Sequence, residues 1–143
     1  GVVAAADTGS TVGATISSST ISGNANGGAV ATSSSLGGGT SSLTLIRSTI
    51  AKNGGVGVWA DGSNPGMQVS VAVSYSAVTE NAGAGVEATG ATTAILVVRS
   101  TIARNMGPDL LNSAGVIRSS LNNTLSGRGA ADVQGTITPN PPQ

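Results

Sequence analysis

The chain has 143 residues and a formal net charge of zero, from six basic and six acidic side chains that make up only 8% of the sequence. Such a composition provides no basic stripe to neutralise phosphates, which argues against binding to nucleic acid or to an anionic membrane surface. Cysteine and histidine are absent, which excludes disulfides, Cys/His zinc sites and histidine-dependent catalytic triads. We expect neither a metal nor a cofactor.

The sequence contains no run of 18 apolar residues, so we expect no membrane insertion. Its polar residues are mainly Ser, Thr, Asn and Gly rather than charged residues, a composition typical of extracellular bacterial proteins. These features predict a secreted protein, in the extracellular space or on the cell surface.

A degenerate motif recurs along the chain, with Ser-Thr-Ile-Ala-Arg-Asn at 100–105 as its clearest copy. The central apolar residues of successive copies are 29, 28, 24 and 23 residues apart, which suits a coil with constant strands and variable turns. The five copies lie at 19–24, 48–53, 76–81, 100–105 and 123–128.

Two further strands accompany each copy. Downstream segments such as Gly-Val-Trp-Ala at 57–60 and upstream segments such as Leu-Thr-Leu at 43–45 alternate in the period of a strand. Three short strands per repeat without a helical segment predict an all-β fold, a right-handed parallel β-helix of about five to six rungs. We assign residues 1–138 to one such domain and 139–143 to a Pro-rich C-terminal tail.

Stacking the rungs predicts which side chains fill the interior. Three aliphatic columns are expected to point inward, formed by Ile21, Ile50, Val78, Ile102 and Leu125, by Ile16, Leu45, Val73 and Val97, and by Val30, Val58, Val86, Leu110 and Val133. Two polar columns are expected beside them, formed by Ser19, Ser48, Ser76, Ser100 and Asn123, and by Asn24, Asn53, Asn81, Asn105 and Arg128. Glycines after each Asn are expected to supply positive φ at the turn.

This repeat resembles that of the right-handed parallel β-helix proteins of the pectate-lyase-like superfamily, with their internal asparagine ladder. It is most similar to uncharacterised secreted bacterial repeat proteins with rungs such as Ser-Thr-Ile-Ala-Arg-Asn followed by Gly-x-Gly-Val. The resemblance covers residues 12–135. It implies the fold, but the superfamily includes lyases, hydrolases, adhesins and inert spacers, so it does not name an activity.

The first residues of the chain match the second strand of later rungs. Gly-Val-Val-Ala at 1–4 aligns with 57–60, so the sequence begins inside a rung without a capping segment. We therefore expect Val2 to be covered by another copy, by a neighbouring molecule or by further sequence.

The sequence allows one pair of neighbouring carboxylates. Asp61 and Glu87 are expected to point outward on adjacent rungs, about 7–8 Å apart along a diagonal. That separation suits an inverting glycosidase, and Trp59 beside them is able to stack a sugar ring. Because no third acid or nearby base completes a site, an ordinary outward column is the favoured interpretation. The calcium-binding aspartate cluster and arginine base that pectate lyases need are not visible.

Other outward columns are interpreted first as structural. Lys52, Glu80 and Arg104 form an alternating charge ladder, and the Tyr75 ring is expected between Arg47 and Arg99, with weak ligand binding as an alternative. A flat strip of Thr, Ser and Ala, similar to the Thr-rich face of ice-binding solenoids, includes Thr20, Thr49, Thr79, Thr101 and Thr124. Ile46, Leu96 and Val98 are unusually apolar for outward positions and predict a lateral protein contact, with self-association as one possibility.

Three functions remain open on this basis. The leading hypothesis is a non-enzymatic extracellular scaffold or adhesive segment. The second is a carbohydrate-binding or polysaccharide-degrading fragment that uses Asp61 and Glu87, and the third is ice binding through the Thr strip.

Overall fold

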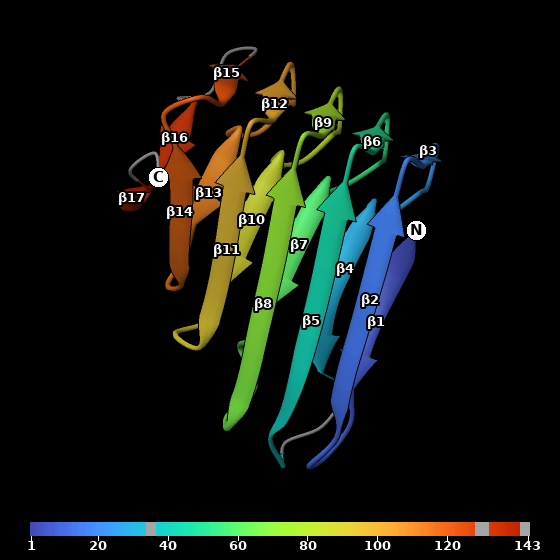
Figure 1. Ribbon diagram of the computed structural model, residues 1–143, viewed down its shortest axis with the longest axis vertical. Coiled ribbons are helices and arrows are strands. Elements are labelled where there is room, and N and C mark those ends of the chain that lie inside the picture. Colours follow the sequence, from blue (N-terminus) through green and yellow to red (C-terminus); the bar gives the residue numbers. More distant parts are fainter. Residues whose placement is uncertain (34–36, 128–131, 141–143) are drawn as a thin grey trace.

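Three parallel sheets wind around one core in a computed structural model that describes residues 1–33, 37–127 and 132–140 (Figure 1). Each turn of the chain adds one strand to each sheet, which makes a right-handed β-helix and confirms the predicted fold class. No helix long and apolar enough to cross a membrane occurs in these residue ranges.

The strands fall into three sets, numbered here by order of appearance in a rung. Sheet 1 contains β1 (Val2–Ala6), β4 (Ala29–Ser33), β7 (Val58–Asp61), β10 (Val86–Thr89), β13 (Leu110–Asn112) and β16 (Val133–Gln134). Sheet 2 contains β2 (Thr11–Ser17), β5 (Gly39–Ile46), β8 (Met67–Ser74), β11 (Thr93–Val98), β14 (Val116–Ser120) and β17 (Ile137–Asn140). Sheet 3 contains β3 (Thr20–Ser22), β6 (Thr49–Ala51), β9 (Ala77–Thr79), β12 (Thr101–Ala103) and β15 (Thr124–Ser126).

The last strand crosses the boundary expected for the Pro-rich tail. β17 continues through Pro139 and Asn140, and the rest of the predicted tail, 141–143, lies outside the described residues. Pro139 is accommodated because β17 is an edge strand of sheet 2, where one side of the backbone needs no partner.

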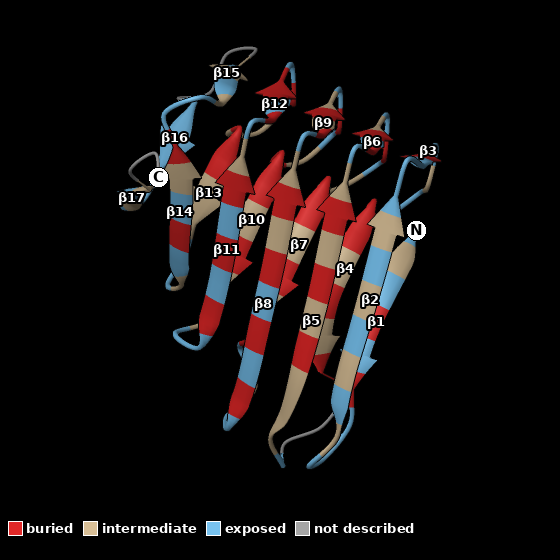
Figure 2. Ribbon diagram, viewed as in Figure 1, coloured by how far each residue is buried: buried red, intermediate tan, exposed pale blue. Residues whose placement is uncertain are grey.

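Side chains alternate along each strand, so that one of every two successive residues points into the core. In β5 and β8 every second residue is buried, which gives the red bands of Figure 2. Parallel pairing stacks these buried residues into columns, because equivalent residues of successive rungs are register partners about 4.8 Å apart. The column through Ile50, Val78 and Ile102 and the column through Leu45, Val73 and Val97 are both confirmed, with these residues fully or almost fully buried.

The third aliphatic column differs from prediction in register at one rung, and at its last rung Val133 is the register partner of Leu110 but is exposed. Ala29, not Val30, pairs with Val58 and enters the core, so Val30 points outward beside Trp59 and Ala31 is buried. The reason is the turn after the Asn column, which always spans five residues, from Asn24 to Ala29 as from Asn53 to Val58. The predicted alignment followed the valine instead of this constant spacing.

The asparagine column forms the predicted ladder through the interior. Asn53 donates from its backbone N–H and from Nδ2 to Oδ1 of Asn81, at 3.1 and 2.9 Å, and Asn81 donates in the same way to Asn105. Arg128, the predicted end of this column, lies outside the described residues. Asp109, which is fully buried, accepts the next hydrogen bond of the ladder from Asn105 Nδ2.

The serine column forms a second ladder at the other turn. Each Ser backbone N–H donates to the hydroxyl of the Ser one rung further on, and the backbone N–H of Ser100 donates to Oδ1 of Asn123 at 2.8 Å. The predicted order of this column, with Asn123 as its end, is confirmed.

The expected source of positive φ is wrong. The left-handed residue of each turn precedes the Asn and is usually not glycine: φ is 56° at Lys52, 58° at Glu80 and 57° at Arg104. The glycines after each Asn serve close packing instead. A Cβ at Gly85 would lie 2.5 Å from Cγ2 of Ile102 and 2.6 Å from Nδ2 of Asn105.

Candidate functional site

Trp59 and Glu87 lie side by side on the outer face of sheet 1, as neighbours in register between β7 and β10. Both side chains are half-buried. Thr89 connects them, because it accepts a hydrogen bond from Trp59 Nε1 at 3.1 Å and donates to Glu87 Oε1 at 3.3 Å. Sequence reasoning missed Thr89, although its position two residues after Glu87 places it on the same face.

Asp61 lies on the predicted diagonal from Glu87, since its register partner is Thr89. Its carboxylate is engaged by the following turn, where Oδ1 accepts from the backbone N–H of Ser63 at 3.1 Å and from its hydroxyl at 2.5 Å. The structure therefore brings the predicted acids together but directs Asp61 toward its own turn.

The environment of Glu87 alters the pKa of its carboxyl group. Burial raises the pKa of Glu87 above its ordinary value of 4.5, the hydrogen bond from Thr89 opposes this, and the charge of Asp61 adds to the increase. A raised pKa on a partly buried carboxyl group is found at catalytic acids and also in purely structural clusters of side chains, so it does not by itself identify a catalytic site.

The raised pKa of Glu87 should make the free energy of unfolding depend on pH. Folded Glu87 binds its proton more tightly than unfolded Glu87, so the free energy of unfolding should fall as the pH rises from 4.5 through the raised pKa. Glu87→Gln should abolish that fall, as measured by urea unfolding at several pH values. Asp61→Asn should lower the pKa of Glu87 in an NMR titration, because it removes a repelling charge.

Asp7→Asn is the matched control, since Asp7 follows β1 at the far end of sheet 1. It should leave the Glu87 titration unchanged. An equal response to both substitutions would show that the Asp61 charge does not act locally.

A groove of about 360 Å³ runs beside Trp59, along the glycine-rich turns between sheets 3 and 1. Its lining consists of Ala25, Asn26, Gly27, Val30, Gly54, Gly55, Val56 and Trp59. Neither Asp61 nor Glu87 contributes to it. A ring stacked on Trp59 within this groove would therefore lie away from the two acids.

The outward charged columns behave mainly as predicted. Glu80 lies 3.0 Å from Arg104 and 4.0 Å from Lys52 (Oε to Nη2 and Nζ), which completes the charge ladder. Tyr75 contacts only one of its two predicted partners: its hydroxyl accepts from Arg99 Nη1 at 2.6 Å, with Arg99 Cζ 5.4 Å from the ring centroid. No contact with Arg47 accompanies it among the described residues.

The Thr strip covers the outer face of sheet 3. Thr20, Thr49, Thr101 and Thr124 share one exposed column, which Ala77 interrupts. Thr79 lies in the neighbouring column, between Ala51 and Ala103.

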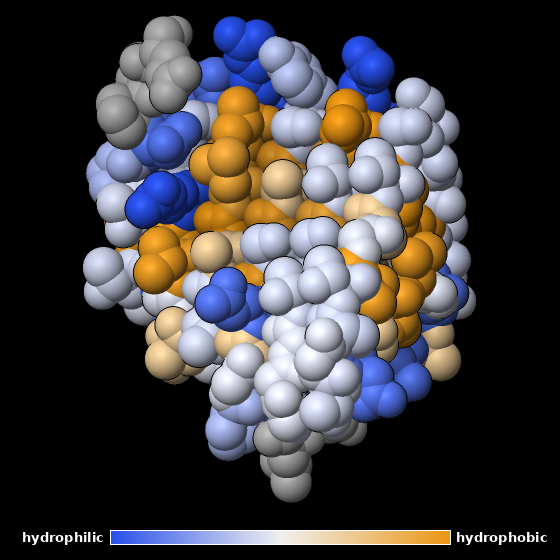
Figure 3. Space-filling view, turned by 60° about the horizontal axis from the view of Figure 1, so that its bottom comes forward, coloured by the Kyte–Doolittle hydropathy of each residue, from blue (hydrophilic) through white to orange (hydrophobic). Residues whose placement is uncertain are grey.

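A groove of about 430 Å³ lies on the outer face of sheet 2, where the sequence predicts only an apolar patch. Figure 3 shows orange surface on this face, next to blue. Of the three residues predicted there, Leu96 lines the groove, whereas Ile46 and Val98 lie in the next outward column. The outward series Thr44, Ala72, Leu96 and Arg118 was the signal that could have found it.

Within residues 1–33, 37–127 and 132–140, no three acidic side chains gather as a metal-binding group. Comparisons of the chain with protein-family models, with curated proteins and with solved structures gave no match.

Proposed function

We propose that this chain is a non-enzymatic, extracellular β-helix that acts as a rigid scaffold or adhesive segment. The observation that carries the proposal is the continuous interior ladder from Asn24 to Asp109. Each Asn is hydrogen-bonded to the Asn of the next rung, and Asp109 accepts from Asn105 in its own turn and from the backbone N–H of Ser126 in the next rung. Repeating nearest-neighbour contacts of this kind make a stiff solenoid that presents extended flat faces.

The outer surfaces and the repeat support the same role. The sheet 3 face is flat and uncharged, and the sheet 2 face combines hydroxyl and apolar side chains. The resemblance of the repeat to pectate-lyase-like and secreted bacterial repeat proteins, together with its low charge, supports an extracellular location.

Hydrogen exchange tests the rigidity on which this role depends. Backbone amides from β4 to β13 should exchange only through global unfolding, because their rungs share one core and two ladders. Fast exchange in a block of central rungs would contradict a rigid scaffold.

A polysaccharide panel tests the absence of catalysis. Asp61→Asn and Glu87→Gln should leave product release from every glycan at the wild-type level. The reason is that Asp61 is hydrogen-bonded to Ser63 and Glu87 to Thr89, and the two acids do not line a common cleft. Release of product from any glycan that is lost in both variants would replace the scaffold by a glycan-degrading enzyme.

One observation supports ice binding as a second candidate. The exposed column Thr20, Thr49, Thr101 and Thr124 sits on a flat sheet with regular spacing between strands of about 4.8 Å. Thermal hysteresis in the wild-type chain, lost in Thr49→Lys and kept in Thr15→Lys on sheet 2, would establish it.

A further inference from the structure

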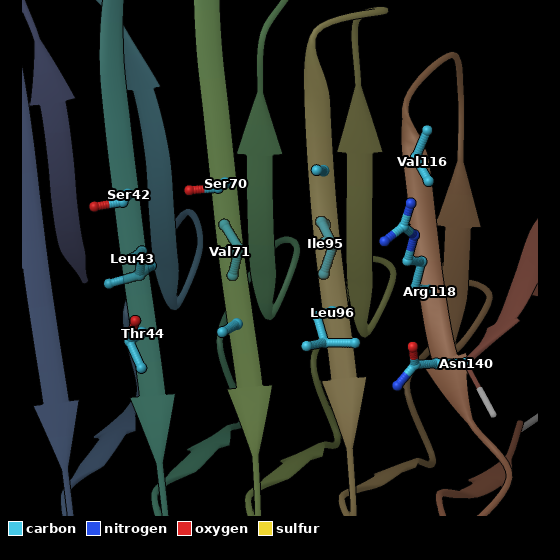
Figure 4. A pocket seen from close by; sticks show the side chains of 12 residues that line it. Ser42, Leu43, Thr44, Ser70, Val71, Ile95, Leu96, Val116, Arg118 and Asn140 are labelled. Atoms are coloured by element: carbon cyan, nitrogen blue, oxygen red, sulfur yellow. The ribbon is translucent and has the colours of Figure 1, made fainter. Parts of the chain in front are cut away.

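The groove on sheet 2 crosses the strands rather than following one of them. It extends from β5 over β8, β11 and β14 to Asn140 of β17. Four steps of about 4.8 Å between neighbouring strands make it about 19 Å long. Figure 4 shows the lining residues on successive strands of the sheet, from Ser42 and Thr44 to Arg118 and Asn140.

The middle of the groove is apolar and open to solvent. Leu96 is the register partner of Ala72, and Leu96 and Val116 remain 37% and 42% exposed. Exposed aliphatic groups lined up in a groove lose nothing by being covered and gain from leaving water, which is the property of a docking surface.

One end of the groove carries an uncompensated positive charge. Arg118 is exposed and follows Leu96 in the same outward column. Within the described ranges it forms no ion pair or side-chain hydrogen bond, whereas Lys52, Arg99 and Arg104 all have partners. The Asn140 amide lies at the same end, and no acidic side chain lines the groove. This end is therefore complementary to an anionic group.

The other end of the groove offers hydroxyl groups. Thr44 and Ser70 line it, and neither hydroxyl shows a side-chain hydrogen bond to another described residue. They are able to donate to and accept from the amide groups of a polar backbone.

The sheet itself restricts how an occupant is recognised. β8 and β11 are paired on both sides, so their backbone groups are already used and cannot accept an added strand. A segment lying along the groove must be recognised by its side chains. At about 3.3 Å per residue, an extended peptide of about six residues fits its length.

We propose that this groove binds an extended peptide segment of a protein partner, in which an aliphatic side chain lies beside an Asp or Glu. The aliphatic side chain packs on Ala72, Leu96 and Val116, and the carboxylate pairs with Arg118 and Asn140. The described lining contains aliphatic but no aromatic side chains, which favours an aliphatic anchor over a stacked sugar ring. The inference rests on the proposed adhesive role and names the chemistry of its partner.

Selection from a phage-displayed library of random linear peptides tests the proposal. Peptides enriched on the wild-type chain should carry Asp or Glu next to Leu, Ile or Val. Their affinity should fall at least tenfold in Arg118→Glu and in Leu96→Asp, as measured by fluorescence anisotropy with the labelled peptides.

Matched controls separate the groove from general surface effects. Arg47→Glu makes the same charge reversal in the turn after β5, and Leu121→Asp changes a leucine that is 80% exposed outside the groove. Both should keep full affinity. If Leu96→Asp fails to fold, as judged by circular dichroism, Leu96→Ser replaces it with the same expectation.

Three results would overturn the peptide proposal. Failure to enrich peptides above the Arg118→Glu background, or equal affinity in groove and control variants, would overturn the peptide proposal. Glycan-array binding that disappears in Arg118→Glu would also overturn it, in favour of an acidic saccharide. None of these results affects the scaffold role, which fails only if glycans are turned over or the central rungs exchange freely.

Discussion

Replacing Asn81 by alanine should lower the free energy of unfolding by about 3 kcal/mol, because it leaves several buried polar groups without partners. Asn81 is fully buried, accepts the backbone N–H and Nδ2 of Asn53, and donates to the carbonyl oxygen of Ile50 at 3.2 Å and to Asn105 Oδ1. Alanine satisfies none of these four contacts and leaves a cavity between two rungs.

Urea denaturation measures this loss, and Asn26→Ala is the control. Asn26 belongs to the same turn region two residues after the ladder, but its side chain is exposed. Its replacement should change the stability by about 0.5 kcal/mol or less. Equal losses in the two variants would mean that the ladder contributes nothing beyond an ordinary surface amide.

Replacing Gly85 by alanine should destabilise the chain by a similar amount, about 3 kcal/mol, for a steric reason. The new Cβ would lie 2.5 Å from Cγ2 of Ile102, 2.6 Å from Nδ2 of Asn105 and 2.8 Å from the carbonyl oxygen of Asp109. The first contact belongs to the aliphatic core, the second to the ladder and the third to the next rung. Relief of the clash must therefore separate two rungs.

Gly13→Ala on sheet 2 is the matched control. There the nearest atom to the new Cβ is the Ser42 hydroxyl oxygen at 3.2 Å, the end of a small side chain on an open face. Thermal unfolding should show a clear fall in midpoint for Gly85→Ala and almost none for Gly13→Ala. A harmless Gly85→Ala would show that the turn after Asn81 has more room than its packing indicates.

These predictions distinguish two roles of a turn residue that the sequence pattern alone does not separate: adopting positive φ, and leaving room for the neighbouring rung. Glycine after Asn suggested a left-handed turn, but the left-handed residues are Lys52, Glu80 and Arg104. Local sequence carries little information on this point, because the preceding residue tolerates positive φ when a ladder holds the turn in place. The glycine is required by the neighbouring rung, and a single rung viewed alone does not reveal it.

The sequence also predicts some features of the candidate sites and leaves others open. Trp59 and Glu87 could be placed on one face from strand alternation and repeat spacing, and the structure makes them neighbours. The link through Thr89 and the turn of Asp61 toward Ser63 depend on side-chain positions, which alternation does not specify. The groove through Leu96 and Arg118 is formed by residues from strands far apart in sequence.

The sequence by itself determined the repeat, the three strands per rung and the identity of most interior columns, because each rung repeats the same apolar, Ser and Asn positions. Only the tertiary structure decided the end of the ladder at Asp109 and the faces that carry grooves. The constant five-residue spacing after each Asn already implied the register at Ala29, and the structure shows that this spacing outweighs the valine at position 30. The physical reason is that stacking energies act between rungs. A column is defined by what lies above and below it, so a residue such as Val30 is placed by its neighbours in space rather than by its own hydrophobicity.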